Sequence, residues 1–310
     1  MYIKRFQNRV AESRYSLPVV GLVVLLFCLM GGMFSDGKWL QFALLALSSF
    51  LMMELNNVNA LIRIYSRMVS CSYLVLAVMS YFLFEDIRCC ILSVCNIAFY
   101  QFFFSSYQDK NAVGRIFYAF LMIGLSSIFF VKVLYFVPLL WILMFTNIMS
   151  GNARTLIASI MGTLLPYWFI GAYCFMTDDM DSLYMHLQTI YDFMPLADWS
   201  GMELSKILTI AFIIVLSVTG MIHFRINNYK DKIRTRMLFE IFSFMNIVII
   251  IFMILQPSYS NELLAMLLVS TSPLIGHYIA LTHTLVTNIS FYVMLLVALV
   301  LTVCNIWMPF

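Results

Sequence analysis

The chain has 310 residues, of which 63% are hydrophobic, 16% aromatic and only 11% charged, with a formal net charge of +3. A soluble domain carries about 25% charged residues, and a single hydrophobic core stops growing near roughly 250–300 residues. This composition excludes a soluble enzyme, a disordered protein and a secreted disulfide scaffold, and it predicts an all-α protein that crosses a membrane many times.

Eleven apolar runs follow one another along the chain, each close to the length that a helix needs to cross about 30 Å of hydrocarbon. Helices are expected because lipid forces every spanning segment to satisfy its own backbone hydrogen bonds. The runs cover residues 16–34, 39–55, 68–84, 89–106, 116–131, 133–149, 156–176, 206–222, 237–255, 262–281 and 287–306. They predict one transmembrane helical bundle over residues 1–310.

The stretch 116–149 is divided into two spans because a single helix of that length would measure about 51 Å, far more than one bilayer. We expect a tight hairpin with Lys132 at its outer turn, where the ammonium group can reach water. Pro138, Pro166 and Pro273 fall inside predicted spans and mark candidate kinks.

Lysine and arginine set the expected orientation, since they concentrate on the cytoplasmic side of membrane proteins. With a cytoplasmic N-terminus and eleven spans, the C-terminus lies outside. Fourteen of the 18 basic residues then lie inside, and ten of the 15 acidic residues lie outside. The basic residues assigned to the inside are Lys4, Arg5, Arg9, Arg14, Arg63, Arg67, Lys110, Arg115, Arg154, Arg225, Lys230, Lys232, Arg234 and Arg236.

Most predicted connections are short, and the exceptions differ in charge. The segment 1–15 is basic and assigned to the cytoplasm, whereas the loop 177–205 is acidic and assigned to the outside. Leu183, Leu187 and Ile190 recur in that outer loop at helical spacing. This pattern predicts an amphipathic helix lying at the membrane–water boundary.

The loop 223–236 is assigned to the cytoplasm and is rich in basic residues. Such a cluster attracts anionic lipid headgroups, although setting the topology alone would also explain it. Nucleic-acid binding is not expected, because the bases are not interleaved with aromatic residues and no phosphate-binding loop is present. The candidate lipid contacts are Arg225, Lys230, Lys232, Arg234 and Arg236.

Carboxylates of the outer loops are the candidate catalytic groups. Asp178, Asp179 and Asp181 follow the seventh predicted span, where they are candidate ligands of a divalent cation that would bridge pyrophosphate oxygens. Asp178 or Asp179 is alternatively a general base, and Asp36 in the first outer loop is an equal candidate. A solvated acidic loop with no catalytic role is the simpler explanation.

Polar residues near the predicted cytoplasmic ends are interpreted as structural. Glu54 is expected to pair with Arg63 or Arg67. His277 and His283 flank the last inner turn, but their six-residue separation places them on different helix faces, so no metal site is expected there.

Several short stretches have a familiar pattern: Leu55 to Asn57, Phe120 to Phe130 with Pro138 to Trp141, Leu165 to Tyr167, Gly276 to Tyr278 and Ser290 to Tyr292. Together they resemble a family of uncharacterised multi-pass inner-membrane proteins from Bacteroidota, and this resemblance implies a bacterial inner-membrane location. The hairpin is also similar to that of the multi-spanning (GT-C) glycosyltransferases that use polyprenyl-phosphate sugars. Those enzymes are expected to have a larger first outer loop with an acidic catalytic residue, a loop that here consists of residues 35–38.

Three functions follow as hypotheses. The first is a GT-C-like enzyme of lipid-linked sugar or cell-envelope glycan assembly, with a polyprenyl-phosphate-linked sugar as substrate and Asp36, Asp178 or Asp179 as its acids. The second is a non-catalytic subunit of an envelope or export complex. The third is a transporter or flippase, which requires a polar pathway through the bundle. The lining of the cavities separates these hypotheses.

Overall fold

The computed structural model describes residues 5–307, and every regular element in that range is helical. Lys4 of the basic N-terminal segment lies outside the described residues. The α-helices are α1 (Phe6–Glu12), α2 (Ser16–Met30), α3 (Trp39–Asn59), α4 (Met68–Met79), α5 (Ile87–Ser105), α6 (Val113–Phe129), α7 (Val137–Thr146), α8 (Ala153–Met176), α9 (Met180–Gln188), α10 (Leu204–Asn227), α11 (Ile233–Leu255), α12 (Ser260–Leu281) and α13 (Leu285–Trp307). Four 3₁₀ helices connect them, η1 (Tyr81–Glu85), η2 (Val131–Phe136), η3 (Asn228–Lys230) and η4 (Pro257–Tyr259).

Seven of the helices between residues 5 and 307 are long and apolar enough to cross a membrane: α3, α5, α8, α10, α11, α12 and α13. The pair α1 and α2, bent by 96°, passes the same test when taken together. The prediction of an all-helical bundle with many membrane-length apolar helices is thereby confirmed. The remaining predicted spans correspond to α4, α6 and α7, which are apolar but shorter.

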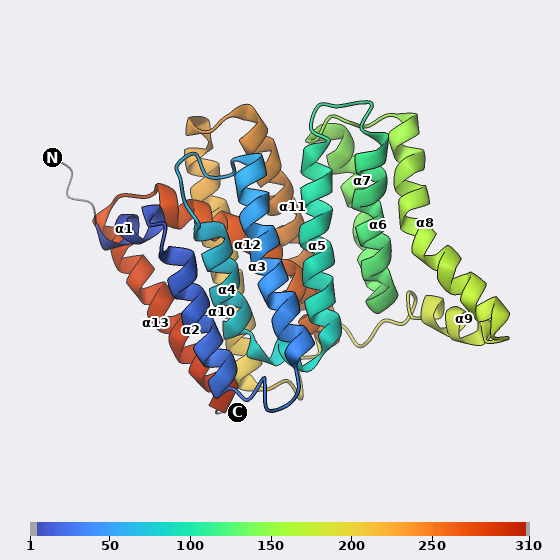
Figure 1. Cartoon of the computed structure of the whole chain (residues 1–310), viewed down its shortest axis with the longest axis horizontal. Helices are drawn as coiled ribbons and strands as arrows, with labels where there is room; N and C mark the ends of the chain where they lie inside the picture. Colours follow the sequence, from blue (N-terminus) through green and yellow to red (C-terminus); the bar gives the residue numbers. More distant parts are fainter. Residues whose placement is uncertain (1–4, 308–310) are drawn as a thin grey trace.

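Helix α12 forms the centre of the bundle. It packs against α4, α5, α10 and α11, and every residue from Leu263 to Ala280 is buried. Figure 1 shows these helices standing side by side, with α6, α7 and α8 grouped at one edge. A helix that is apolar on all sides must be surrounded by other helices, which explains the central position of α12.

Two glycines allow α6 and α8 to pack closely. A Cβ atom on Gly124 would lie 2.6 Å from the carbonyl oxygen of Thr163, and a Cβ atom on Gly162 would overlap the carbonyl oxygen of Phe117. Small residues at such positions let membrane helices approach backbone to backbone. The start of α8 is fixed by Asn152 and Thr155, which form a reciprocal capping box.

The hairpin predicted within 116–149 differs from expectation in three details. Lys132 at its turn is only 2% exposed, so the prediction that its ammonium reaches water is wrong. The first helix ends at Phe129, and the returning segment begins as η2 before it becomes α7. Pro138 lies in the first turn of α7, where its missing N–H has no partner to lose, so the predicted kink at Pro138 is wrong. Pro166 and Pro273 do lie inside helices, α8 and α12.

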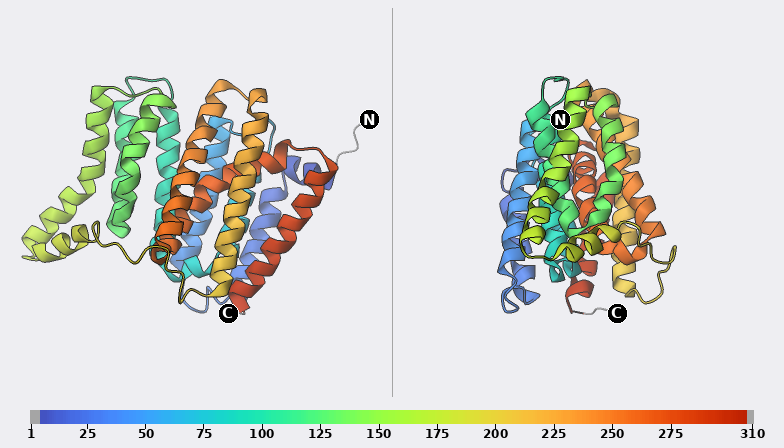
Figure 2. Two further views of the ribbon diagram at one scale, coloured as in Figure 1. Left: turned by 180° about the vertical axis from the view of Figure 1, so that it is seen from behind. Right: turned by 90° about the vertical axis from the view of Figure 1, so that its right-hand side faces the viewer.

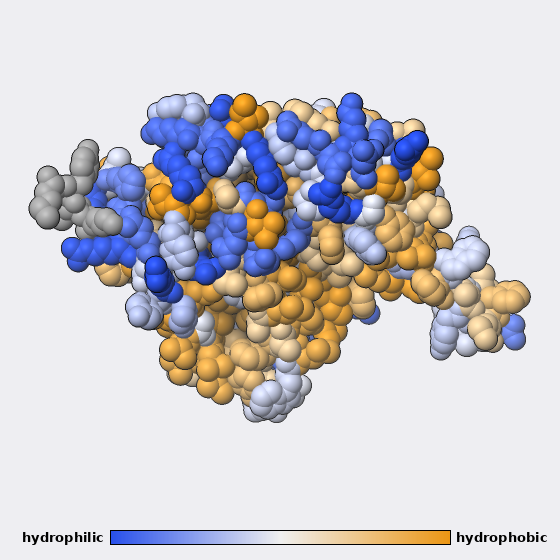
Figure 3. All heavy atoms as spheres, turned by 45° about the horizontal axis from the view of Figure 1, so that its top comes forward, coloured by the Kyte–Doolittle hydropathy of each residue, from blue (hydrophilic) through white to orange (hydrophobic). Residues whose placement is uncertain are grey.

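Basic and apolar surfaces are separated along the bundle. The connections α3–α4, α5–α6, α7–α8 and α10–α11 lie at the upper end in Figure 1, whereas α13 ends at the lower end. Figure 3 shows hydrophilic residues gathered over that upper end and apolar residues covering the surface below it. We call the upper end the basic end.

An arm formed by the end of α8 and by α9 projects from the lower end of the bundle (Figures 1 and 2). Helix α9 lies within the acidic loop 177–205 and has no buried residue. The chain then returns beneath the bundle to α10. The structure therefore contains a helix in the predicted segment, and its placement at a membrane boundary stays a prediction.

Candidate functional site

The predicted acidic residues lie far apart at the lower end of the bundle. Asp36 is in the α2–α3 connection and pairs with Lys38 at 3.2 Å. Asp179 caps α9, where its carboxylate accepts hydrogen bonds from the backbone N–H and the hydroxyl of Ser182. The α2–α3 connection and α9 lie on opposite sides of the molecule (Figure 1). The structure does not bring Asp36 together with Asp178 and Asp179.

The predicted donors of the cation site, Asp178, Asp179 and Asp181, lie at the end of α8 and the start of α9. Within residues 5–307, no group of three or more His, Cys, Asp or Glu side chains is arranged to hold a metal ion. Both carboxylate oxygens of Asp179 are engaged by Ser182. These residues do not fit a divalent cation.

The predicted ion pair of Glu54 with Arg63 or Arg67 is replaced by other contacts. The Arg63 guanidinium lies 3.7 Å from the Asp231 carboxylate. Arg67 donates to the side chains of Asn57 and Tyr65. Sequence proximity favoured Glu54, whereas the packing of the α10–α11 connection onto the α3–α4 connection brings Asp231 to Arg63.

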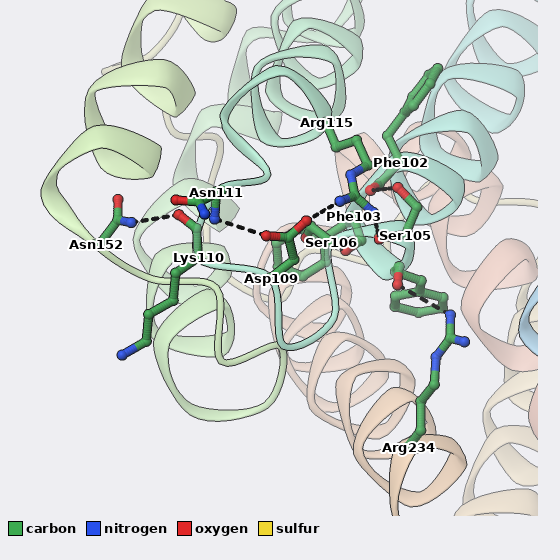
Figure 4. Close-up of polar contacts among 11 residues, drawn as sticks. Phe102, Phe103, Ser105, Ser106, Asp109, Lys110, Asn111, Arg115, Asn152 and Arg234 are labelled. Atoms are coloured by element: carbon green, nitrogen blue, oxygen red, sulfur yellow. Dashed lines mark hydrogen bonds and ion pairs between the residues drawn. The ribbon is translucent and has the colours of Figure 1, made fainter.

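The predicted lipid-contact residues are not equivalent. Arg234 donates to the Asn59 side chain at 2.9 Å and lies over the Tyr107 ring, and Arg236 donates to the backbone oxygen of Asp231 at 3.0 Å. Figure 4 shows Arg234 beside the α5–α6 connection. The guanidinium groups of these two arginines therefore bind other groups of the protein, and the two are weaker candidates for lipid contact than Arg225.

The α5–α6 connection at the basic end is also internally bonded. Arg115 binds the Asp109 carboxylate, and Asn152 donates to the backbone oxygen of Lys110 at 2.6 Å. In Figure 4 the Lys110 side chain points away from these contacts. The bonds tie the start of α8 to the neighbouring loop and leave the Lys110 ammonium at the surface.

A buried ionisable network lies at the basic end of α12. The imidazole of His277 is 3.0 Å from the Asp231 carboxylate, and the two side chains are only 1% and 3% exposed. Arg63 contacts the second carboxylate oxygen and is 39% exposed, so it connects the pair to the surface. A buried carboxylate is costly unless it is paired, and here it is paired on both sides.

A second histidine extends this network. The His223 ring on α10 lies 5.4 Å from the His277 ring and 5.2 Å from the Tyr278 ring, centroid to centroid. The Nδ1 atoms of both histidines are buried and have no hydrogen-bond partner among residues 5–307. Buried polar atoms are usually bonded, and a neutral imidazole has one nitrogen that can accept a proton. We call Arg63, His223, Asp231 and His277 the histidine network.

Further polar groups follow α12 toward the other end of the bundle. The Asn246 side chain accepts hydrogen bonds from Ser270 at 2.8 Å and Thr271 at 3.1 Å. Pro273 interrupts the backbone hydrogen bonds of α12 between these residues and His277. Buried polar atoms without a partner lie on the surrounding helices: the hydroxyls of Ser70, Ser72 and Ser217 and the amide nitrogen of Asn246.

The histidine network was missed in the sequence because its members are far apart. His277 was paired only with His283, which is exposed, and Asp231 stood as a lone acid in a basic loop. Hydropathy does not predict that this loop folds inward onto α12. The sequence feature that could have indicated this pairing is a histidine within an apolar span together with a single acidic residue in a basic loop.

An apolar cavity of about 230 Å³ lies under α1, between α2, α4, α12 and α13. Its lining includes Phe6, Val20, Cys71, Ile275 and Phe291 and exposes no polar surface. The candidate catalytic aspartates do not line it. This cavity suits hydrocarbon and not a sugar phosphate.

No family model, no curated protein and no solved structure matches the chain. The functional interpretation therefore rests on the residues of this chain.

Proposed function

We propose that the chain is a multi-pass transport protein that binds a proton in the histidine network of α12. The observation that carries this proposal is the buried pair of His277 and Asp231. Ionisable residues inside membrane bundles are expensive and form proton relays in pumps and transporters. Histidine is suited to this role because its ordinary pKa lies close to neutral pH.

Separate buried polar groups along α12 support transport. Glu262 lies in the first turn of α12, at the lower end of the bundle. Ser270, Thr271 and the unpaired hydroxyls lie between Glu262 and the histidine network. Buried unpaired polar groups are the usual partners of internal waters, and a chain of waters moves protons. Such a pathway is what the transporter hypothesis requires.

The proposal includes the threading. Eleven crossings, with the basic end in the cytoplasm, place the histidine network at the cytoplasmic mouth of the bundle of a bacterial inner membrane. The separation of the basic end from the apolar surface supports this orientation. Helix α6, with 17 residues, spans about 26 Å and crosses if the bilayer thins slightly around it.

A non-catalytic subunit is the second candidate, because the exposed arm of α8 and α9 projects away from the bundle. Stoichiometric co-purification of another membrane protein, lost on deletion of residues 180–188, would favour it. The GT-C-like enzyme has no comparable support, since Asp36 lies apart from Asp178 and Asp179 (Figure 1) and none of the three lines the cavity under α1.

Proton movement tests the proposal directly. Purified protein in liposomes, with an imposed pH gradient and a trapped pH-sensitive dye, is expected to collapse the gradient at least ten-fold faster than protein-free liposomes. Asp231→Asn and His277→Phe are expected to abolish the difference. His283→Phe removes an exposed imidazole and serves as the matched control. Equal rates for the wild type, Asp231→Asn and His277→Phe would contradict the proposal.

A further inference from the structure

Helices α10 and α11 are consecutive but hardly contact each other. Both pack against α12, and the short η3 segment joins them at the basic end. Because α10 and α11 both pack against α12 but make few contacts with each other, they leave a wedge-shaped gap at the surface of the bundle. In a bilayer such a gap cannot stay empty, because its lining would lose its packing contacts.

A groove with a cavity of about 300 Å³ occupies this gap. Most of its lining is hydrocarbon, including Val218 and Ile222 from α10 and Phe244 and Ile247 from α11. Arg225, one turn beyond Met221 toward the basic end, is the charged residue among those that line the groove. An apolar slot that ends in a guanidinium matches an acyl chain that ends in a phosphate.

Arg225 lines the groove and, unlike Arg234 and Arg236, has no protein partner among the described residues. Within that part of the chain its guanidinium makes no hydrogen bond or ion pair. Lys230 lies over the Tyr229 ring. An arginine fork is the group best suited to bidentate recognition of a phosphate.

We propose that the groove between α10 and α11 binds one anionic phospholipid. An acyl chain lies along Val218, Ile222 and Ile247, and the headgroup phosphate receives hydrogen bonds from Arg225. The site is independent of proton movement, because none of its residues belongs to the histidine network.

Native mass spectrometry of the full chain, released from detergent after titration with phosphatidylglycerol, tests this site. We expect the wild type to bind one phosphatidylglycerol tightly. Arg225→Gln is expected to bind it about five-fold more weakly, because the variant loses one contact between a basic residue and the lipid. Lys232→Gln removes the same charge from the same loop and is expected to bind as the wild type does. Phosphatidylcholine is expected to bind no better to the wild type than to Arg225→Gln.

A second variant tests the chain-binding part. Ile222→Trp fills the groove from a surface position and is expected to weaken phosphatidylglycerol binding while leaving Arg225 in place. Millimolar inorganic phosphate is expected not to displace the lipid, which separates a phospholipid site from a free-phosphate site. Equal losses in Arg225→Gln and Lys232→Gln, or unchanged binding in Ile222→Trp, would overturn the proposal.

Discussion

At the residue scale, Asp231 is a buried carboxylate paired with both Arg63 and His277. Asp231→Ala leaves Arg63 and the buried His277 without their common partner. Breaking a buried pair from one side costs about 3–5 kcal/mol, so we expect the free energy of unfolding to fall by about 3 kcal/mol. Thermal and denaturant unfolding of the purified protein in detergent measure this change.

Asp198→Ala is the matched control, because Asp198 lies in the exposed outer loop and bonds only Ser200 among the described residues. Its effect is expected to stay within about 0.5 kcal/mol, as for other surface substitutions. If Asp231→Ala were as stable as Asp198→Ala, the buried contacts of Asp231 would be wrong.

Gly162 tests the close packing of α6 and α8. Gly162→Ala places a methyl group on the Phe117 carbonyl oxygen, and overpacking of this kind costs about 1–3 kcal/mol. Gly114→Ala, on α6 with nothing within 4 Å of the added atom, is expected to be neutral or stabilising. Unfolding curves of the two variants that coincide would show that α6 and α8 do not approach as described.

At the element scale, Lys132 holds the acidic loop 177–205 against the bundle. Lys132 was expected to reach water, yet it is 2% exposed. Its ammonium donates to the backbone oxygen of Asp192 and lies 3.7 Å from the Tyr259 ring centroid and 4.9 Å from that of Phe193. These contacts combine a charged hydrogen bond with cation–π attraction.

Lys132→Met is therefore expected to loosen residues 191–193, whereas the two hydrogen bonds between Gln256 and Met194 keep the following residues in place. Chymotrypsin added to intact spheroplasts should then cut near Tyr191 and Phe193 at least several-fold faster than in the wild type. Lys38→Met, which removes a lysine of the first outer loop, is the control and should leave the cutting rate unchanged. Equal rates in Lys132→Met and the wild type would show that Lys132 does not hold this loop.

The helices were predictable from sequence where hydropathy alone determines them. The runs 39–55, 237–255 and 287–306 each lie within a long helix, α3, α11 and α13. Helix ends were not predictable, because turns and caps set them: the run 68–84 splits into α4 and the 3₁₀ helix η1, and Pro138 starts a helix where a kink was expected.

The site was less predictable than the fold. Asp231 and His277 are 46 residues apart, and their contact depends on a loop folding back onto α12. Charge counting placed both near the same end of the bundle but gave no reason to pair them. Arg225 was predicted with four other basic residues, and only the packing of α10 and α11 distinguishes it.

At the scale of the whole molecule, one arrangement explains both proposals. The buried α12 carries His277 of the histidine network at the basic end, and α10 and α11, which pack against α12, leave the groove that is the proposed lipid site. In the proposed threading, the basic end lies in the cytoplasm. The side on which each end lies therefore decides whether the histidine network faces the cytoplasm.

Two reporters on the intact chain measure directly on which side of the membrane each end of the bundle lies. A reporter that is active only outside the cytoplasm, attached after α13, is expected to be active. A reporter that fluoresces only in the cytoplasm, inserted at residues 229–230 of the α10–α11 connection, is expected to fluoresce. Finding both positions on the same side of the membrane would contradict the threading and remove the histidine network from the cytoplasmic mouth.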